Sequence, residues 1–170
     1  NLSLHLLELF TSRVAKVGMT DGIRQVLQEE SDALRAYYEQ AGILIARPAG
    51  GTSCRLAISA KGGTNAENHN HNDVGSYAVA LGSETMVGDQ GGPNSYPGDY
   101  FNGDAPQKSK IKGSFGHPVP VVDGRTQSSG GKAKGVVLQK EFTNDKAVFS
   151  IDYTSDYSTP KLDKLIRTLV

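Results

Sequence analysis

The stretch VGSYAVALGSETMVGD, residues 74–89, decides the fold class of this 170-residue chain. Small and apolar residues alternate along residues 74–81, which places Tyr77 and Val79 on one face of an extended strand. The Gly-Ser pair that follows supplies a turn, and residues 85–89 return as a second strand. The stretch therefore predicts an antiparallel hairpin.

Short strand-like runs continue on both sides of this hairpin. Gly is frequent, at 20 of 170 residues, and it falls mainly between these runs, where turns are needed. Seven or more short strands at close spacing predict a mainly β fold, an antiparallel β-sandwich over residues 42–170. The further runs are residues 43–47, 55–59, 119–122, 135–140, 147–153 and 162–170.

Residues 1–41 show a different period. Leu and Val recur near helical spacing up to Gly18, and a second apolar face continues from Ile23 to Ala41. Gly42 stands where a left-handed C-terminal cap is expected. The pattern predicts short α-helices that precede the β-sandwich.

Composition excludes several classes of function. Lys plus Arg equals Asp plus Glu, at 18 each, so there is no electrostatic reason to bind nucleic acid or an anionic membrane. No apolar run approaches the roughly 18 residues of a membrane-spanning helix. Cys54 is the one cysteine, which excludes a disulfide scaffold and a thiolate zinc site.

The string NHNHND, residues 68–73, is the most polar part of the β region. It has low propensity for helix and strand and would be costly to bury, so it is a candidate site. In an extended segment, His69 and His71 point to the same face, about 7 Å apart along the chain. By itself, His-x-His is weak evidence for a metal, since an ordinary polar loop explains it more readily.

Two later residues strengthen the case for a metal. Asp89 ends the returning strand of the hairpin, and His117 precedes the run at residues 119–122. If these strands are neighbours, His71, Asp89 and His117 converge on one ion. Two imidazoles, one carboxylate and a water suit Zn²⁺ better than Ca²⁺ or Mg²⁺.

The same residues resemble the central motif of the heparinase II/III-like polysaccharide lyases. The resemblance lies in residues 68–77, in GDQG at 88–91 with Tyr96 downstream, and in GHPVPVVDG at 116–124. It extends from about residue 42 to 127 and more loosely to 170. Pro118 departs from the family, which usually has Asn after this His. That leaves the metal position intact but puts the local hydrogen bonding in doubt.

The resemblance implies a larger parent enzyme. Such lyases carry an N-terminal α/α toroid followed by antiparallel β domains, with the active site between them. Residues 1–41 would then be the last toroid helices or their connection, and the chain would form the β-side wall of the site. Its partner would be the missing toroid, which carries the main catalytic residues, so the isolated fragment is expected to be inactive. An exposed toroid-facing surface could also drive homo-oligomer formation.

Family roles carry over position by position. His69 resembles the histidine that faces the substrate, and Tyr96 resembles a tyrosine that approaches the catalytic centre. Asn68 and Asn70 would donate hydrogen bonds to the substrate. The remaining set resembles the ligands of a structural zinc, namely His71, Asp89 and His117.

The implied activity is β-elimination on an acidic, uronate-containing polysaccharide, in the periplasm or after secretion. The enzyme removes the proton alpha to the uronate carboxylate and expels the O4 substituent, so the carboxylate must be neutralised by donors. Heparan sulfate, hyaluronan or chondroitin, and alginate all stay open as the substrate.

Two other functions compete with this interpretation. One is a non-catalytic carbohydrate-binding β-sandwich, which the absence of Trp disfavours, because sugar platforms usually stack on aromatic rings. The other is a zinc hydrolase with a His₂Asp site and an open water position. Glu67 and Asp73 are the nearby carboxylates that could serve it as a base, and we rank it lowest.

Overall fold

The computed structural model describes residues 35–48, 52–89, 109–143 and 146–170. These residues are mainly β, every strand pair among them is antiparallel, and they contain no α-helix. The predicted mainly β, antiparallel class is therefore confirmed. No helix in this part of the chain is long and apolar enough to span a bilayer.

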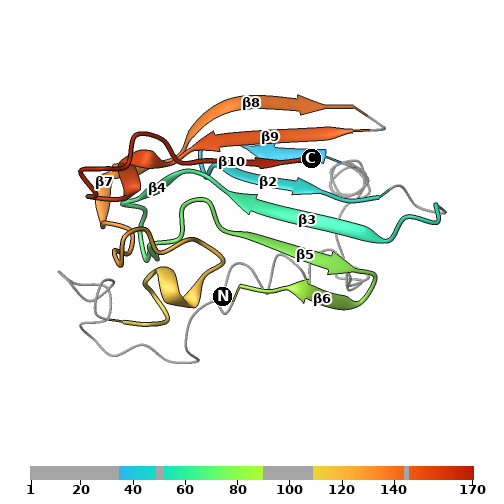
Figure 1. The fold of residues 1–170 in the computed structure, drawn as a ribbon. Coiled ribbons are helices and arrows are strands. Elements are labelled where there is room, and N and C mark those ends of the chain that lie inside the picture. Colours follow the sequence, from blue (N-terminus) through green and yellow to red (C-terminus); the bar gives the residue numbers. More distant parts are fainter. Residues whose placement is uncertain (1–34, 49–51, 90–108, 144–145) are drawn as a thin grey trace, which may run out of the picture.

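The largest sheet has five strands. Three hairpins build it, with one longer connection between the second and the third, and the hairpin predicted from residues 74–89 forms one of its edges (Figure 1). In spatial order the strands are β1 (Arg35–Tyr38), β2 (Ile43–Ala46), β3 (Leu56–Lys61), β5 (Tyr77–Leu81) and β6 (Glu84–Val87).

Two smaller sheets complete the described fold. The three-stranded sheet has the order β10-β9-β8, and β4 pairs with β7 in a two-stranded sheet. Two short 3₁₀ helices, η1 (Ser114–Gly116) and η2 (Thr154–Asp156), lie in the connections. The strand bounds are β4 (Thr64–Asn65), β7 (Gly130–Lys134), β8 (Val136–Phe142), β9 (Ala147–Asp152) and β10 (Ile166–Leu169).

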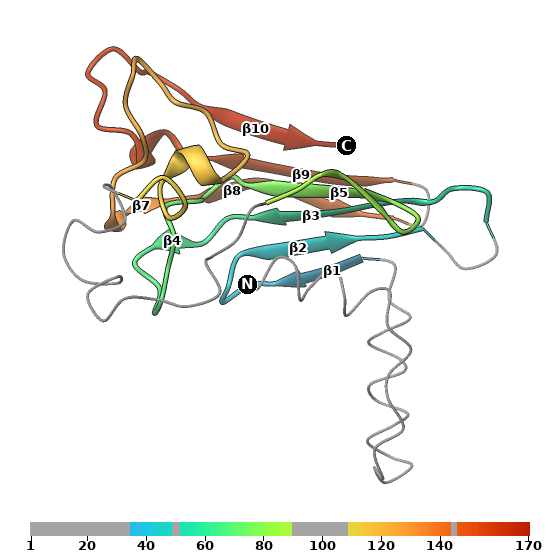
Figure 2. The same ribbon diagram turned by 90° about the horizontal axis from the view of Figure 1, so that it is seen from below.

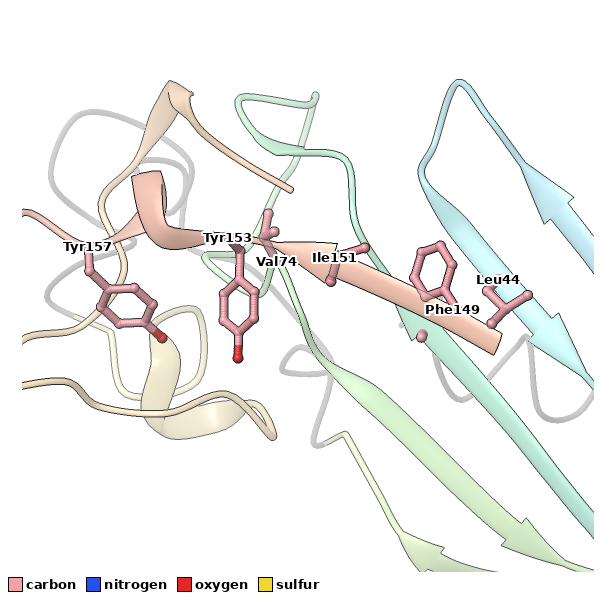
Figure 3. Close-up of a cluster of buried hydrophobic side chains, with 7 residues drawn as sticks. Leu44, Val74, Phe149, Ile151, Tyr153 and Tyr157 are labelled. Atoms are coloured by element: carbon pink, nitrogen blue, oxygen red, sulfur yellow. The ribbon is translucent and has the colours of Figure 1, made fainter. Parts of the chain in front are cut away.

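The two larger sheets share one hydrophobic core. On β9, Phe149 and Ile151 are 1% and 2% exposed, and they cluster with Leu44 of β2 and Ala60 of β3 (Figure 3). Val74 continues this core toward the loop that follows β4. Side chains of β2, β3 and β9 thus meet in one core, and β2 and β9 are buried over several consecutive residues.

The helix predicted up to residue 41 is wrong over its last part. Residues 35–38 form β1, which pairs with β2, so Tyr37 packs on Phe149 as a strand residue with ring centroids 5.6 Å apart. Gly42 does adopt the expected left-handed conformation (φ +64°), but it closes the β1–β2 turn. Residues 1–34 of the helical prediction lie outside the described residues.

Gly42 also makes a close backbone contact that only glycine permits. Its carbonyl accepts a 2.7 Å hydrogen bond from the Gly62 amide, and a Cβ at Gly42 would collide with the Gly63 backbone. A Cβ at Gly63 (φ +69°) would in turn lie 2.9 Å from the Ala41 carbonyl oxygen. The β1–β2 turn is therefore packed directly on the segment that leads to the polar loop.

The strand predicted at residues 119–122 reduces to one isolated bridge between Val122 and Arg125. Pro118 and Pro120 carry no amide hydrogen, so this segment cannot supply a regular ladder. A turn follows this segment, in which Asp123 and Gly124 both have positive φ, at 51° and 70°.

Candidate metal-binding site

Three stretches far apart in the sequence meet near one end of the sheets. The first is the polar loop, residues 66–76, which connects β4 to β5. The second follows β6 and carries Asp89, and the third is η1 with His117 at its C-terminal end. This end also holds the small β4–β7 sheet, at the left in Figure 1 and Figure 2.

His117 lies at the centre of the contacts between these stretches. Its Nε2 is 3.1 Å from Nδ1 of His71, and its Nδ1 is 2.8 and 2.9 Å from the two carboxylate oxygens of Asp89. The side chains of His117 and Asp89 are 1% and 7% exposed. The structure therefore brings together the three residues that the sequence proposed as ligands.

The environment of His71 keeps its imidazole neutral. Burial lowers the pKa of His71 to about 4, and the adjacent His117 acts in the same direction, against Asp73. A neutral imidazole is the form that binds a metal, so His71 needs no proton loss near neutral pH to act as a ligand.

Asp73 also joins this cluster, although the sequence suggested it only as a nearby carboxylate that could serve a zinc hydrolase as a base. Asp73, Asp89 and His117 each place one ligand atom within 4.8 Å of the others, so this group could hold a metal ion. Asp73 also accepts a 2.6 Å hydrogen bond from Lys61 Nζ. Asp73 is thus already neutralised by a cation from β3.

The other residues of the polar loop divide into two kinds. Asn68 and His69 are exposed, whereas the Asn70 side chain is engaged within the protein, because its Oδ1 accepts from Lys61 (3.0 Å) and its Nδ2 donates to the His71 carbonyl. His69 has φ +56°, a left-handed conformation that is uncommon for a residue with a side chain. Tyr96 lies outside the described residues.

Several residues that support the site were missed from the sequence. Lys61 ends a strand and carries no spacing signal, and Gln127 is an isolated polar residue in a turn-rich segment. Lys112 is wholly buried next to the loop: its carbonyl accepts from the Asn72 amide at 2.8 Å, and burial lowers its pKa. A buried lysine or glutamine is recognisable as such only when its neighbours are known.

Two possible donor sets overlap at His117. The set predicted from the sequence combines His71, Asp89 and His117, whereas the group whose ligand atoms all lie within 4.8 Å of one another contains Asp73 in place of His71. Both sets combine imidazole nitrogen with carboxylate oxygen, which are donors that zinc accepts. Asp89 and His71 contact different nitrogens of the His117 ring. The Asp89 carboxylate therefore orients the His117 ring from the side of the ring opposite His71.

Comparison with known proteins identifies no relative, since no family model and no curated protein matches the chain.

Proposed function

We propose that the chain forms the β-side wall of a polysaccharide lyase that cleaves uronate-containing glycans by β-elimination. In this proposal the fold is a β-sandwich of the heparinase II/III-like type, and the ligands of a structural zinc are His71, Asp89 and His117. The observation that carries the proposal is the contact of His117 with both other residues, across 46 and 28 positions of the sequence.

His69 is the residue of this chain that we assign to the substrate. It is exposed beside the His71–His117 pair, and the left-handed backbone at this non-glycine residue is a form of strain that proteins often keep at functional positions. Its imidazole can donate a hydrogen bond to the uronate carboxylate or hold the proton released from the sugar ring. Asn68 is exposed next to it and supplies a neutral donor.

The zinc has a structural part in this scheme. When bound, it links the polar loop to the segment that carries His117. His71 and His117 would then hold the polar loop in one orientation, so that His69 faces the substrate. Tyr96 keeps its proposed catalytic role, and the substrate-binding role proposed for Asn70 would require it to leave its contact with Lys61.

The test combines metal content and ligand binding on the purified chain. Elemental analysis should find about one zinc per chain in the wild type and none in His71→Ala or His117→Ala. An NMR titration should show shifts of the His69 imidazole with a uronate oligosaccharide but not with a neutral glucan.

If the wild-type protein is folded but contains no zinc, the proposed metal site is wrong. If the His69 imidazole shifts equally with the uronate oligosaccharide and the neutral glucan, the proposed lyase function is wrong. A longer protein that includes the toroid should release unsaturated, ultraviolet-absorbing products from a uronate polysaccharide, which hydrolysis does not generate.

A further inference from the structure

The polar loop obtains much of its backbone support from one side chain. Residues 66–76 lie outside the strands, so their amide and carbonyl groups need other partners. The Gln127 Oε1 accepts from the Val74 amide at 3.1 Å, and its Nε2 donates to the Val74 carbonyl at 2.6 Å. One side-chain amide thus pairs with both backbone groups of Val74, as a neighbouring strand would.

Gln127 also binds the beginning of the loop. Its Oε1 accepts a second hydrogen bond, 3.0 Å long, from Asn65 Nδ2, and its backbone carbonyl accepts from Asn72 Nδ2 at 3.2 Å. Gln127 and Asn72 are each 1% exposed, and Val74 is fully enclosed. Hydrogen bonds at such depth are costly to leave unmade, so they restrict the loop to one position.

The same residue reaches the segment that carries His117. The backbone amide of Gln127 donates a 2.9 Å hydrogen bond to Ser114 Oγ. Ser114 is the first residue of η1, and His117 directly follows the last residue of η1. Ser114 is 1% exposed. Gln127 therefore contacts both stretches whose imidazoles meet, although it touches neither His71 nor His117 through any bond described above.

We propose that Gln127 is the positioning residue of the His71–His117 pair, holding the polar loop and η1 at the separation that lets the two rings meet. Its role in metal binding rests on the proposed function, whereas its role in the ring contact does not. Loss of such a supporting contact commonly weakens metal binding about 10–100-fold.

The variant Gln127→Glu tests this inference with little change in volume. It removes the donor to the Val74 carbonyl and leaves an acceptor in its place. Ser114→Ala is the milder companion, since it deletes the bond to η1 alone, and it carries the test if Gln127→Glu fails to fold. Phe149→Leu is the control, because it destabilises the shared core but removes no hydrogen bond to the loop or to η1.

Two measurements are made on the full chain. Zinc affinity is determined by competition with a chromophoric chelator, and the proximity of the two imidazoles is determined by NOEs in metal-free protein. We expect Gln127→Glu to lose the NOE between the rings and to bind zinc about 10–100-fold more weakly. Ser114→Ala should shift both in the same direction by less, and Phe149→Leu should change neither.

The inference is overturned if Gln127→Glu, or Ser114→Ala in its place, keeps the NOE between the rings. It is also overturned if Phe149→Leu loses that NOE to the same extent, since general destabilisation would then explain the effect. A wild-type chain that binds no zinc contradicts the proposed metal site instead, and the NOE measurement then decides on Gln127 by itself.

Discussion

Asp156 is a carboxylic acid inside the protein, with no exposed surface. Burial raises its pKa to about 7, and the negative charges of Asp152 and Asp73 add to the effect, against the Lys134 amide and Lys61. Between pH 3.8, its ordinary pKa, and about 7, the folded chain therefore binds this proton more tightly than the unfolded chain does. The resulting stabilisation is complete below the ordinary value and is lost as the pH rises through about 7.

The substitution Asp156→Asn should remove this pH dependence. We expect the difference in melting temperature between the variant and the wild type to move in favour of the variant as the pH rises from about 4 to about 7. Thermal unfolding in metal-free buffer across that range measures it. A difference that stays constant with pH would show that the carboxyl titrates normally.

At this scale the sequence pointed to His71, Asp89 and His117, which the structure brings into contact around His117, but not to the residues that hold them in place. His71, Asp89 and His117 could be named because His and Asp within polar, turn-rich segments have few structural uses. Gln127 and Lys61 could not, because each acts through a partner, Val74 or Asp73, that lies 53 or 12 residues away. Only the folded chain reveals which polar residue meets which.

At the scale of the elements, β10 joins the segments that carry His71 and His117 to the three-stranded sheet. Arg167 donates to the Gly75 carbonyl, at the end of the polar loop, and to the Pro118 carbonyl at 2.8 Å, directly after His117. Its guanidinium lies 4.8 Å from the Tyr77 ring centroid. The carbonyl of Pro118 is thus hydrogen-bonded within the protein.

Arg167→Lys should lower the free energy of unfolding by about 1–3 kcal/mol, because an ammonium group cannot reproduce the two-carbonyl contact and leaves a buried acceptor unmet. Urea denaturation measures the change. Arg125→Lys is the matched control: Arg125 also donates to a backbone carbonyl, but at the surface, so its loss should stay within about 0.5 kcal/mol. Equal losses of unfolding free energy in the two variants would contradict a special role for the two hydrogen bonds of Arg167.

The strands were predictable from alternation and turn residues, and the errors have physical causes. Residues 35–41 contain Tyr37 and Tyr38, which fit a helix face or a strand equally well, and pairing with β2 decides for the strand. At residues 119–122 the apolar pattern favoured a strand, but the prolines on either side of Val119 limit pairing. Pairing with β2 thus determined the structure of residues 35–38, and the missing amide hydrogens of the prolines prevented a regular strand at residues 119–122.

At the scale of the whole molecule, the site lies where β4, β6 and η1 end, so an ion bound there would tie together separate parts of the chain. Such an ion binds the folded chain and not the unfolded one, in which these residues are far apart. Metal binding and global stability are therefore coupled.

Zinc at about 100 times its dissociation constant should raise the free energy of unfolding by about 2.7 kcal/mol. Urea denaturation with zinc, compared with a chelator, measures this rise, and Mg²⁺ at the same concentration should give almost none. His117→Ala should abolish the rise. A zinc-dependent rise that persists in that variant would place the bound metal elsewhere.

The contact between Gly42 and Gly63 limits how far this protein can drift in sequence. A Cβ at Gly42 would collide with the backbone of Gly63, and a Cβ at Gly63 would meet the carbonyl of Ala41, the residue before Gly42. A mutation at either position therefore cannot be rescued by a compensating change at the other. In a library that randomises both codons, the variants that still fold should carry glycine at both positions. The two glycines therefore allow the β1–β2 turn to pack closely on the segment that leads to the polar loop.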